Sequence, residues 1–188
     1  MRSFNNDNAF TGLEAAIVLI AFVVVAAVFS YVVLGAGFFT TQKSQEVVHT
    51  GVQQASSTLE IVGNVYGTAT TPSAGIDSLN FSCALAPGGT PVDFDKLVIT
   101  YSNSSTLATL AHVTTNVQPG QWIIATVQNE VTPDAVLEKG EQFDITAKPP
   151  NNIMKNDQFN LEIKPAIGAA LSISRTAPAS IQKVNTIY

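Results

Sequence analysis

The sequence contains a single cysteine, Cys83, and few basic residues, with nine lysines and arginines against fourteen aspartates and glutamates. One cysteine excludes a disulfide within the chain and any metal site assembled from several thiolates. The net charge of −5 argues against nucleic acid as a partner, because phosphate binding needs a concentrated basic face. Cys83 stands in an apolar run, which predicts a small buried side chain rather than a reactive thiol.

Charge is absent altogether from the 28 residues between Ala15 and Gln42. As a helix this segment spans about 42 Å at about 1.5 Å per residue, more than the roughly 30 Å hydrocarbon core of a bilayer. Exposure to water would cost about 1.5 kcal/mol or more for each large apolar side chain. A soluble monomer is therefore excluded, and the segment must lie in a membrane, in a protein bundle, or in each in turn. It is also longer than the apolar region of about 7–15 residues in a secretory signal peptide.

Beyond this segment, apolar residues continue at helical spacing, with intervals of four and three residues. We therefore predict one helix over residues 10–65, apolar at first and amphipathic later, that packs against copies of itself. The residues expected to serve this assembly are Gly12, Glu14, Val24, Val48, Val52, Ala55, Leu59 and Val62.

The remaining chain has the composition of a β domain. Residues 66–75 are rich in Thr, Ser, Ala and Pro and are predicted to form a linker, and residues 76–188 are predicted to form the outer domain. About seven β-rich runs separated by turn residues are typical of an immunoglobulin-like antiparallel β-sandwich. The predicted fold class is thus α+β, a long hydrophobic helix followed by this sandwich. The runs are 78–85, 96–102, 106–113, 121–127, 143–147, 159–164 and 170–174.

The sequence shows no catalytic constellation, so we expect neither enzymatic activity nor a cofactor. His49 and His112 lie about sixty residues apart with no motif around either. Asp93 and Asp95 are two residues apart, which places both carboxylates on one face of a strand or loop, where a divalent cation is conceivable. No further ligand can be placed from the sequence, and this favours a solvated polar face.

Two tripeptides match the acceptor pattern for asparagine-linked glycosylation in an exported chain, Asn80-Phe-Ser and Asn103-Ser-Ser. Asn103 follows a β-rich run and lies in a polar turn. Asn80 lies within a β-rich run, where burial is expected. Asn103 is therefore the better candidate.

The N-terminus resembles the archaeal flagellins and, more broadly, proteins made from a type IV pilin-like precursor. In that group a leader is removed just before a hydrophobic helix, the fifth mature residue is glutamate, and in the flagellins the third is often glycine. Cleavage between Ala9 and Phe10 would remove residues 1–9 and place Gly12 third and Glu14 fifth. Where the family usually has a basic residue followed by glycine, this chain has Asn8 and Ala9.

The C-terminal half is also similar to the closing strands of the flagellins, at residues 136–145 and 159–181. The resemblance implies an extracellular filament on the archaeal cell surface with helices in its core and β domains in its sheath, used for swimming. It implies identical or sister subunits, a leader peptidase, and a membrane motor with its ATPase as partners, and a precursor held briefly in the cytoplasmic membrane. An adhesion pilin and a membrane-anchored extracellular binding protein remain as alternatives.

Overall fold

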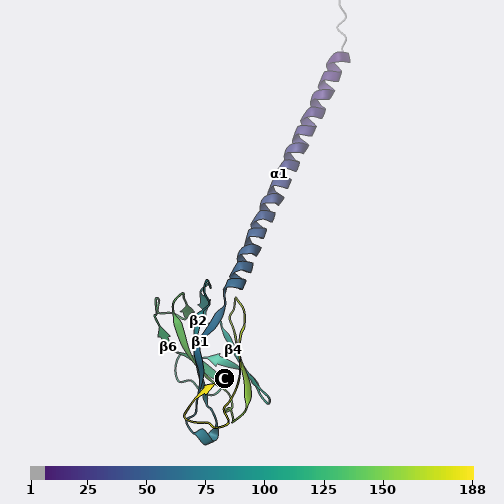
Figure 1. Cartoon of the computed structure of the whole chain (residues 1–188). Helices are drawn as coiled ribbons and strands as arrows, with labels where there is room; N and C mark the ends of the chain where they lie inside the picture. Colours follow the sequence, from purple (N-terminus) through teal and green to yellow (C-terminus); the bar gives the residue numbers. More distant parts are fainter. Residues whose placement is uncertain (1–6) are drawn as a thin grey trace, which may run out of the picture. The chain divides into compact units, whose positions relative to one another are not determined.

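The structure is a computed structural model that describes the backbone from Asp7 to Tyr188 and the side chains from Gly12 onward. Its first element is α1, an uninterrupted helix of 50 residues from Asp7 to Ser56 (Figure 1). The helix is apolar on all sides along its charge-free part. Its threonines there satisfy their hydroxyls internally, since Thr40 Oγ1 donates to the Ala36 carbonyl at 2.8 Å and Thr41 Oγ1 to the Phe38 carbonyl at 2.9 Å. Such bonds let hydroxyls lie in apolar surroundings.

The prediction that the helix extends to residue 65 is wrong, because α1 ends at Ser56 and is followed by strand β1 (Leu59–Thr68). The Ser57 N–H makes the last helical bond, to the Gln53 carbonyl at 2.9 Å. Past this point the chain pairs with the next strand (Ser78–Leu85) and with the last strand (Val184–Ile187). This tertiary pairing overrides the helical spacing of the apolar residues.

A β-bulge lies between Val62 and Tyr66 of β1. Gly63 has φ +83°, which glycine adopts readily. The bulge adds two residues to β1 relative to β2, so Leu59 and Val65 face the core on either side of it. The strand lacks a clear alternation because Val62 and Tyr66, on its exposed side, are apolar. The predicted linker over 66–75 is also wrong at its start, since Tyr66 and Gly67 are strand residues.

Nine strands form one sheet in the described part of the chain, in the order β10-β9-β4-β5-β6-β8-β2-β1-β11. Their pairing is antiparallel except for a short parallel contact between β5 and β6. Two further strands, β3 and β7, pair with each other. The strands are β1 (Leu59–Thr68), β2 (Ser78–Leu85), β3 (Val92–Asp93), β4 (Val98–Asn103), β5 (Leu107–His112), β6 (Gln121–Gln128), β7 (Val136–Leu137), β8 (Gln142–Lys148), β9 (Gln158–Lys164), β10 (Leu171–Thr176) and β11 (Val184–Ile187).

The sheet folds over at the β5–β6 contact, so that one core is shared by its two halves. Tyr101 and Phe159 from one half are buried in the same cluster as Trp122 and Phe143 from the other. Phe94 joins them, with its ring 4.9 Å from Phe143 and 6.4 Å from Trp122 in edge-on geometry. Such aromatic pairs add to the stabilisation from area burial alone.

The predicted fold class is confirmed as a long apolar helix followed by a domain of mainly antiparallel strands. Each of the seven predicted runs coincides with a strand to within two residues at either end. The sequence did not indicate β1, the short β3 and β7, or the C-terminal β11. The compact unit that carries the strands begins at Gly51, not at the predicted residue 76.

Candidate assembly surfaces

Helix α1 presents large apolar side chains to solvent along its whole described length. Phe22 is 71% exposed and Val24 is 55% exposed. The helix is long and apolar enough to cross a membrane by length and composition. A single helix that is apolar all round has no polar side to turn toward water, so it requires a lipid or protein environment on every face.

The predicted assembly residues divide between the two compact units. Gly12, Glu14, Val24 and Val48 are exposed on α1, and Val52 and Ala55 are exposed on the part of α1 that belongs to the β-domain unit. Beyond the charge-free segment, the first charged residues are Lys43 and Glu46, which pair at 2.7 Å on the helix surface.

Leu59 and Val62 are not on a helical seam, which corrects their predicted role. Leu59 is 2% exposed in strand β1 and belongs to the core of the β domain. Val62 lies at the bulge of the same strand and is partly exposed. A substitution at Leu59 therefore tests the folding of the β domain and not the packing of the helix.

Ser57, the residue after α1, makes several contacts with other parts of the β domain. Ser57 is buried, its carbonyl oxygen accepts a hydrogen bond from the Ala169 N–H at 3.2 Å, and its hydroxyl bonds that of Thr90. Gly168 has φ +119°, and a β-carbon added there would lie 1.9 Å from the Ser57 carbonyl oxygen. Two loops from distant parts of the sequence thus enclose Ser57, and only glycine fits at residue 168.

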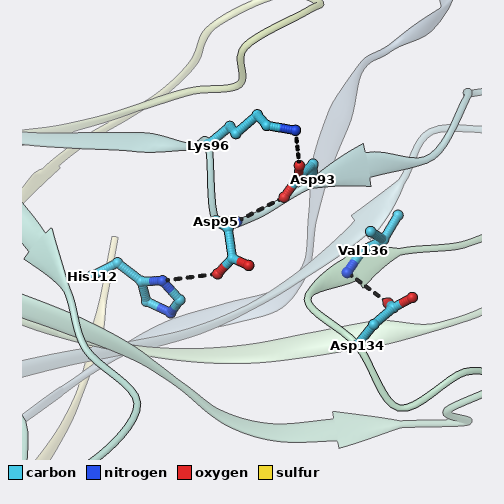
Figure 2. A network of polar contacts seen from close by, with 6 residues as sticks. All are labelled: Asp93, Asp95, Lys96, His112, Asp134 and Val136. Carbon is cyan, nitrogen blue, oxygen red and sulfur yellow. Dashed lines mark hydrogen bonds and ion pairs between the residues drawn. The ribbon is translucent and has the colours of Figure 1, made fainter.

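The aspartates considered for a cation are held by protein donors (Figure 2). Asp93 accepts hydrogen bonds from Lys96 Nζ at 2.6 Å and from the Asp95 N–H at 3.0 Å, and the bond from Lys96 lowers the pKa of the Asp93 carboxyl. Asp95 lies 3.4 Å from Nδ1 of His112, whose ring stacks on Trp122. Among the described residues, no three His, Cys, Asp or Glu side chains converge as a metal site would require. A cation at Asp93 stays a prediction, and it would have to displace Lys96.

The two glycosylation candidates differ in their surroundings. Asn103 ends β4, and its side-chain oxygen accepts hydrogen bonds from the backbone N–H groups of Ser105 at 3.0 Å and Thr106 at 2.7 Å, in a turn whose tip is exposed. Asn80 lies within β2, where its amide nitrogen donates to Thr68 and its oxygen accepts from Thr146. Attachment at Asn80 would break this cross-strand network, so the structure favours Asn103 as the acceptor.

Glu141 is a residue whose role the sequence did not reveal. In the sequence it belongs to a charged loop, yet its side chain is buried. The carboxylate accepts hydrogen bonds from the N–H groups of Val131 at 2.7 Å and Glu138 at 2.8 Å. It thus fixes the loop between β6 and β7. The only hint in the sequence was its place directly before the apolar alternation of β8.

The comparisons with known proteins agree with this architecture. Residues 9–175 match the sequence model of the archaeal-type flagellins, which covers most of the chain. The chain belongs to the archaeal-type flagellin family. A relative is probable flagellin 1 of Archaeoglobus fulgidus, 44% identical over 203 aligned residues that cover 98% of this chain and 97% of that one.

Solved structures of flagellins show the same fold. The archaeal flagellum of Methanospirillum hungatei strain JF1 matches with a TM-score of 0.76 and 36% identity, over 94% of this chain and 99% of that chain. The flagellin FlaB1 of Methanocaldococcus jannaschii matches with a TM-score of 0.59 and 18% identity, over 69% and 95% of the two chains, and supports the fold alone. Flagellins are structural subunits, and this flagellin is a subunit of an archaeal flagellar filament on the cell surface.

Proposed function

We propose that this flagellin polymerises through α1, with the helices of many copies packed together as the filament core and the β domains forming the sheath. The observation that carries this proposal is the exposure of apolar side chains along the whole described part of α1. Packing among copies removes this surface from water, which stabilises the assembly by about 25 cal/mol for each Å² of apolar surface buried.

We propose further that the chain reaches the filament by way of the membrane. The same helix suits a bilayer in length and hydropathy, so a precursor can be held there until a leader peptidase cuts between Ala9 and Phe10. Residues 1–6 of this leader lie outside the described residues, and of Ala9 and Phe10 only the helical backbone is described. A membrane motor with its ATPase then assembles and rotates the filament.

A substitution at Val24 tests the core packing. An aspartate midway along the apolar segment costs about 2.5–3.5 kcal/mol for membrane insertion alone, and a similar charge is unfavourable inside a helix bundle. We expect Val24→Asp to abolish filaments recovered by shearing the cells. The matched control is Gln54→Asp, which places the same charge on an exposed polar position of α1 and is expected to assemble.

Normal filament yield from Val24→Asp would show that α1 is not the core. N-terminal sequencing of the recovered filament protein tests the leader at the same time, since the mature chain is expected to begin at Phe10.

A further inference from the structure

One exposed loop of the β domain, residues 129–135, combines an apolar tip with acidic flanks. Val131 is 70% exposed at the tip, and Pro133 is also exposed. Glu130 and Asp134 stand on either side of them and are exposed as well. We call these residues the acidic loop.

The acidic loop is held in one shape although it lies at the surface. Buried Glu141 accepts the Val131 N–H, and the Ala135 carbonyl accepts the Phe94 N–H at 2.9 Å. Asp134 Oδ1 accepts the Val136 N–H at 2.8 Å (Figure 2). A loop ordered before binding loses little conformational entropy when a partner docks, so each contact yields more affinity.

A groove elsewhere on the domain has the complementary character. Met154, 51% exposed, lies there beside exposed Lys155, with the apolar side chains of Pro72 and Ile181. We call it the basic groove, and its lining is Pro72, Ser73, Gly75, Met154, Lys155 and Ile181.

The carboxylates near the basic groove are engaged within the domain. Asp77 accepts the Thr70 N–H at 2.7 Å, and Asp157 accepts the Met154 N–H at 3.1 Å. Lys155 is therefore the charged side chain that the groove presents to solvent. An apolar surface bordered by a lysine suits an apolar tip bordered by carboxylates.

The two surfaces lie at opposite ends of strand β8. Glu141, which anchors the acidic loop, comes directly before the strand at Gln142. The strand ends at Lys148. The groove lies past this end, where Ile153, the residue before Met154, pairs with Ile76. Six rises of about 3.3 Å separate the two ends of this strand by roughly 20 Å. A loop therefore cannot reach the groove of its own chain.

We propose that the acidic loop of one copy docks in the basic groove of a second copy. This rests on the proposed function, because the filament is what brings the β domains together. The two surfaces are different, so the contact is head-to-tail and leaves a free loop at one end and a free groove at the other. Contacts of this kind build open helical polymers when their rotation does not close into a ring, and they do not form two-fold dimers.

Charge reversal in the full-length chain tests the proposal. Glu130→Lys alone and Lys155→Glu alone are expected to speed the loss of subunits from purified filaments by up to about fivefold at low salt, the range of an exposed ion pair. The double variant is expected to restore the original rate, which a pairwise contact requires. Lys164→Glu, at an exposed position at the end of β9 and outside both surfaces, is the control.

Val131→Asp tests the apolar tip, and we expect at least about a tenfold faster loss because a charge replaces an apolar contact. Near-ultraviolet circular dichroism of subunits dissociated into detergent, which covers α1, checks that each variant is folded. Unchanged loss rates in both single reversals, or a double variant worse than either, would overturn the docking. That outcome is distinct from failure of the proposed function, which is shown by normal filaments from Val24→Asp.

Discussion

The Glu141 carboxylate accepts a 2.7 Å hydrogen bond from the backbone N–H of Val131, so a buried acid in one loop holds the exposed tip of another. The bond from Val131 lowers the pKa of the Glu141 carboxyl, and that from Glu138 adds to the effect, against burial, which raises it. No lysine or arginine pairs with Glu141 in the described part of the chain. Its charge is stabilised by backbone dipoles.

The β domain is expected to lose stability in acid through Glu141. Because the pKa is lower in the folded state, the stabilisation is present above the unfolded value of about 4.3 and is lost as the pH falls toward the folded value. Glu141→Gln is expected to cost about 1–3 kcal/mol at pH 7 and to weaken the dependence on pH below about 4.5. Thermal unfolding followed by the fluorescence of Trp122, the single tryptophan, measures both.

Glu138→Gln is the matched control, since the Glu138 side chain only accepts a long bond from Thr132 at 3.4 Å. Equal losses in the two variants would mean that the loop depends on total charge and not on the Glu141 hydrogen bonds.

Gly168→Ala is expected to destabilise the β domain strongly. The added β-carbon would lie 1.9 Å from the Ser57 carbonyl oxygen, and φ +119° is strained for any other residue, so the chain around Ser57 must shift at a cost beyond the roughly 1–3 kcal/mol of backbone strain alone. Gly88→Ala is the control, because Gly88 also has positive φ, +84°, but open space around it. Equal melting temperatures for the two variants would argue against a tight enclosure of Ser57.

Asn103 is expected to carry a glycan in native filaments. The acceptor turn is exposed at Ser104 and Ser105, where a glycosylating enzyme has access. Ser105→Ala removes the required hydroxyl while the Ser105 N–H still bonds Asn103 Oδ1, so loss of the glycan should leave the turn intact. Peptide mass spectrometry measures occupancy, with the Asn80 peptide as the internal comparison. An unmodified Asn103 together with a modified Asn80 would reverse the assignment.

Glu14→Gln is expected to slow filament assembly while leaving leader removal intact. Cleavage before Phe10 creates a positive amine, and we expect Glu14 to meet that of a neighbouring subunit in an environment with little water. Removing one partner of a buried ion pair costs about 3–5 kcal/mol. Filament growth in cells and the mature N-terminus, measured together, separate assembly from cleavage. Normal growth would assign Glu14 to favourable charge placement at the start of the helix.

The long helix and the central strands could be predicted because their signals are local. A charge-free segment of 28 residues is compatible with few structures besides a long buried helix. In strands such as β2 and β8, buried apolar residues, among them Phe81 and Ile145, alternate with less buried residues. The start of the β domain could not be predicted, since apolar Val62 and Tyr66 lie on the exposed side of β1 and Leu59 continues the helical spacing. Pairing of β1 with the following strand β2 and with the distant β11 determines that this segment is a strand.

The roles of residues that contact distant parts of the chain could not be predicted from the sequence either. Glu141 looks like any loop carboxylate until the fold brings the Val131 N–H to it. Gly168 has no recognisable motif, and its role arises only because Ser57, more than a hundred residues earlier, passes beside it.

The burial of Cys83 has a practical consequence for the fluorescent labelling of filaments on living cells. Its thiol lies in the β-domain core, and burial raises its pKa to about 12, so almost none is present as the thiolate that reacts with maleimides. A cysteine introduced at an exposed position such as Lys164 would then be the one site that a dye can label. Fluorescent rotating filaments are thus accessible through a single substitution, with the native cysteine left in place.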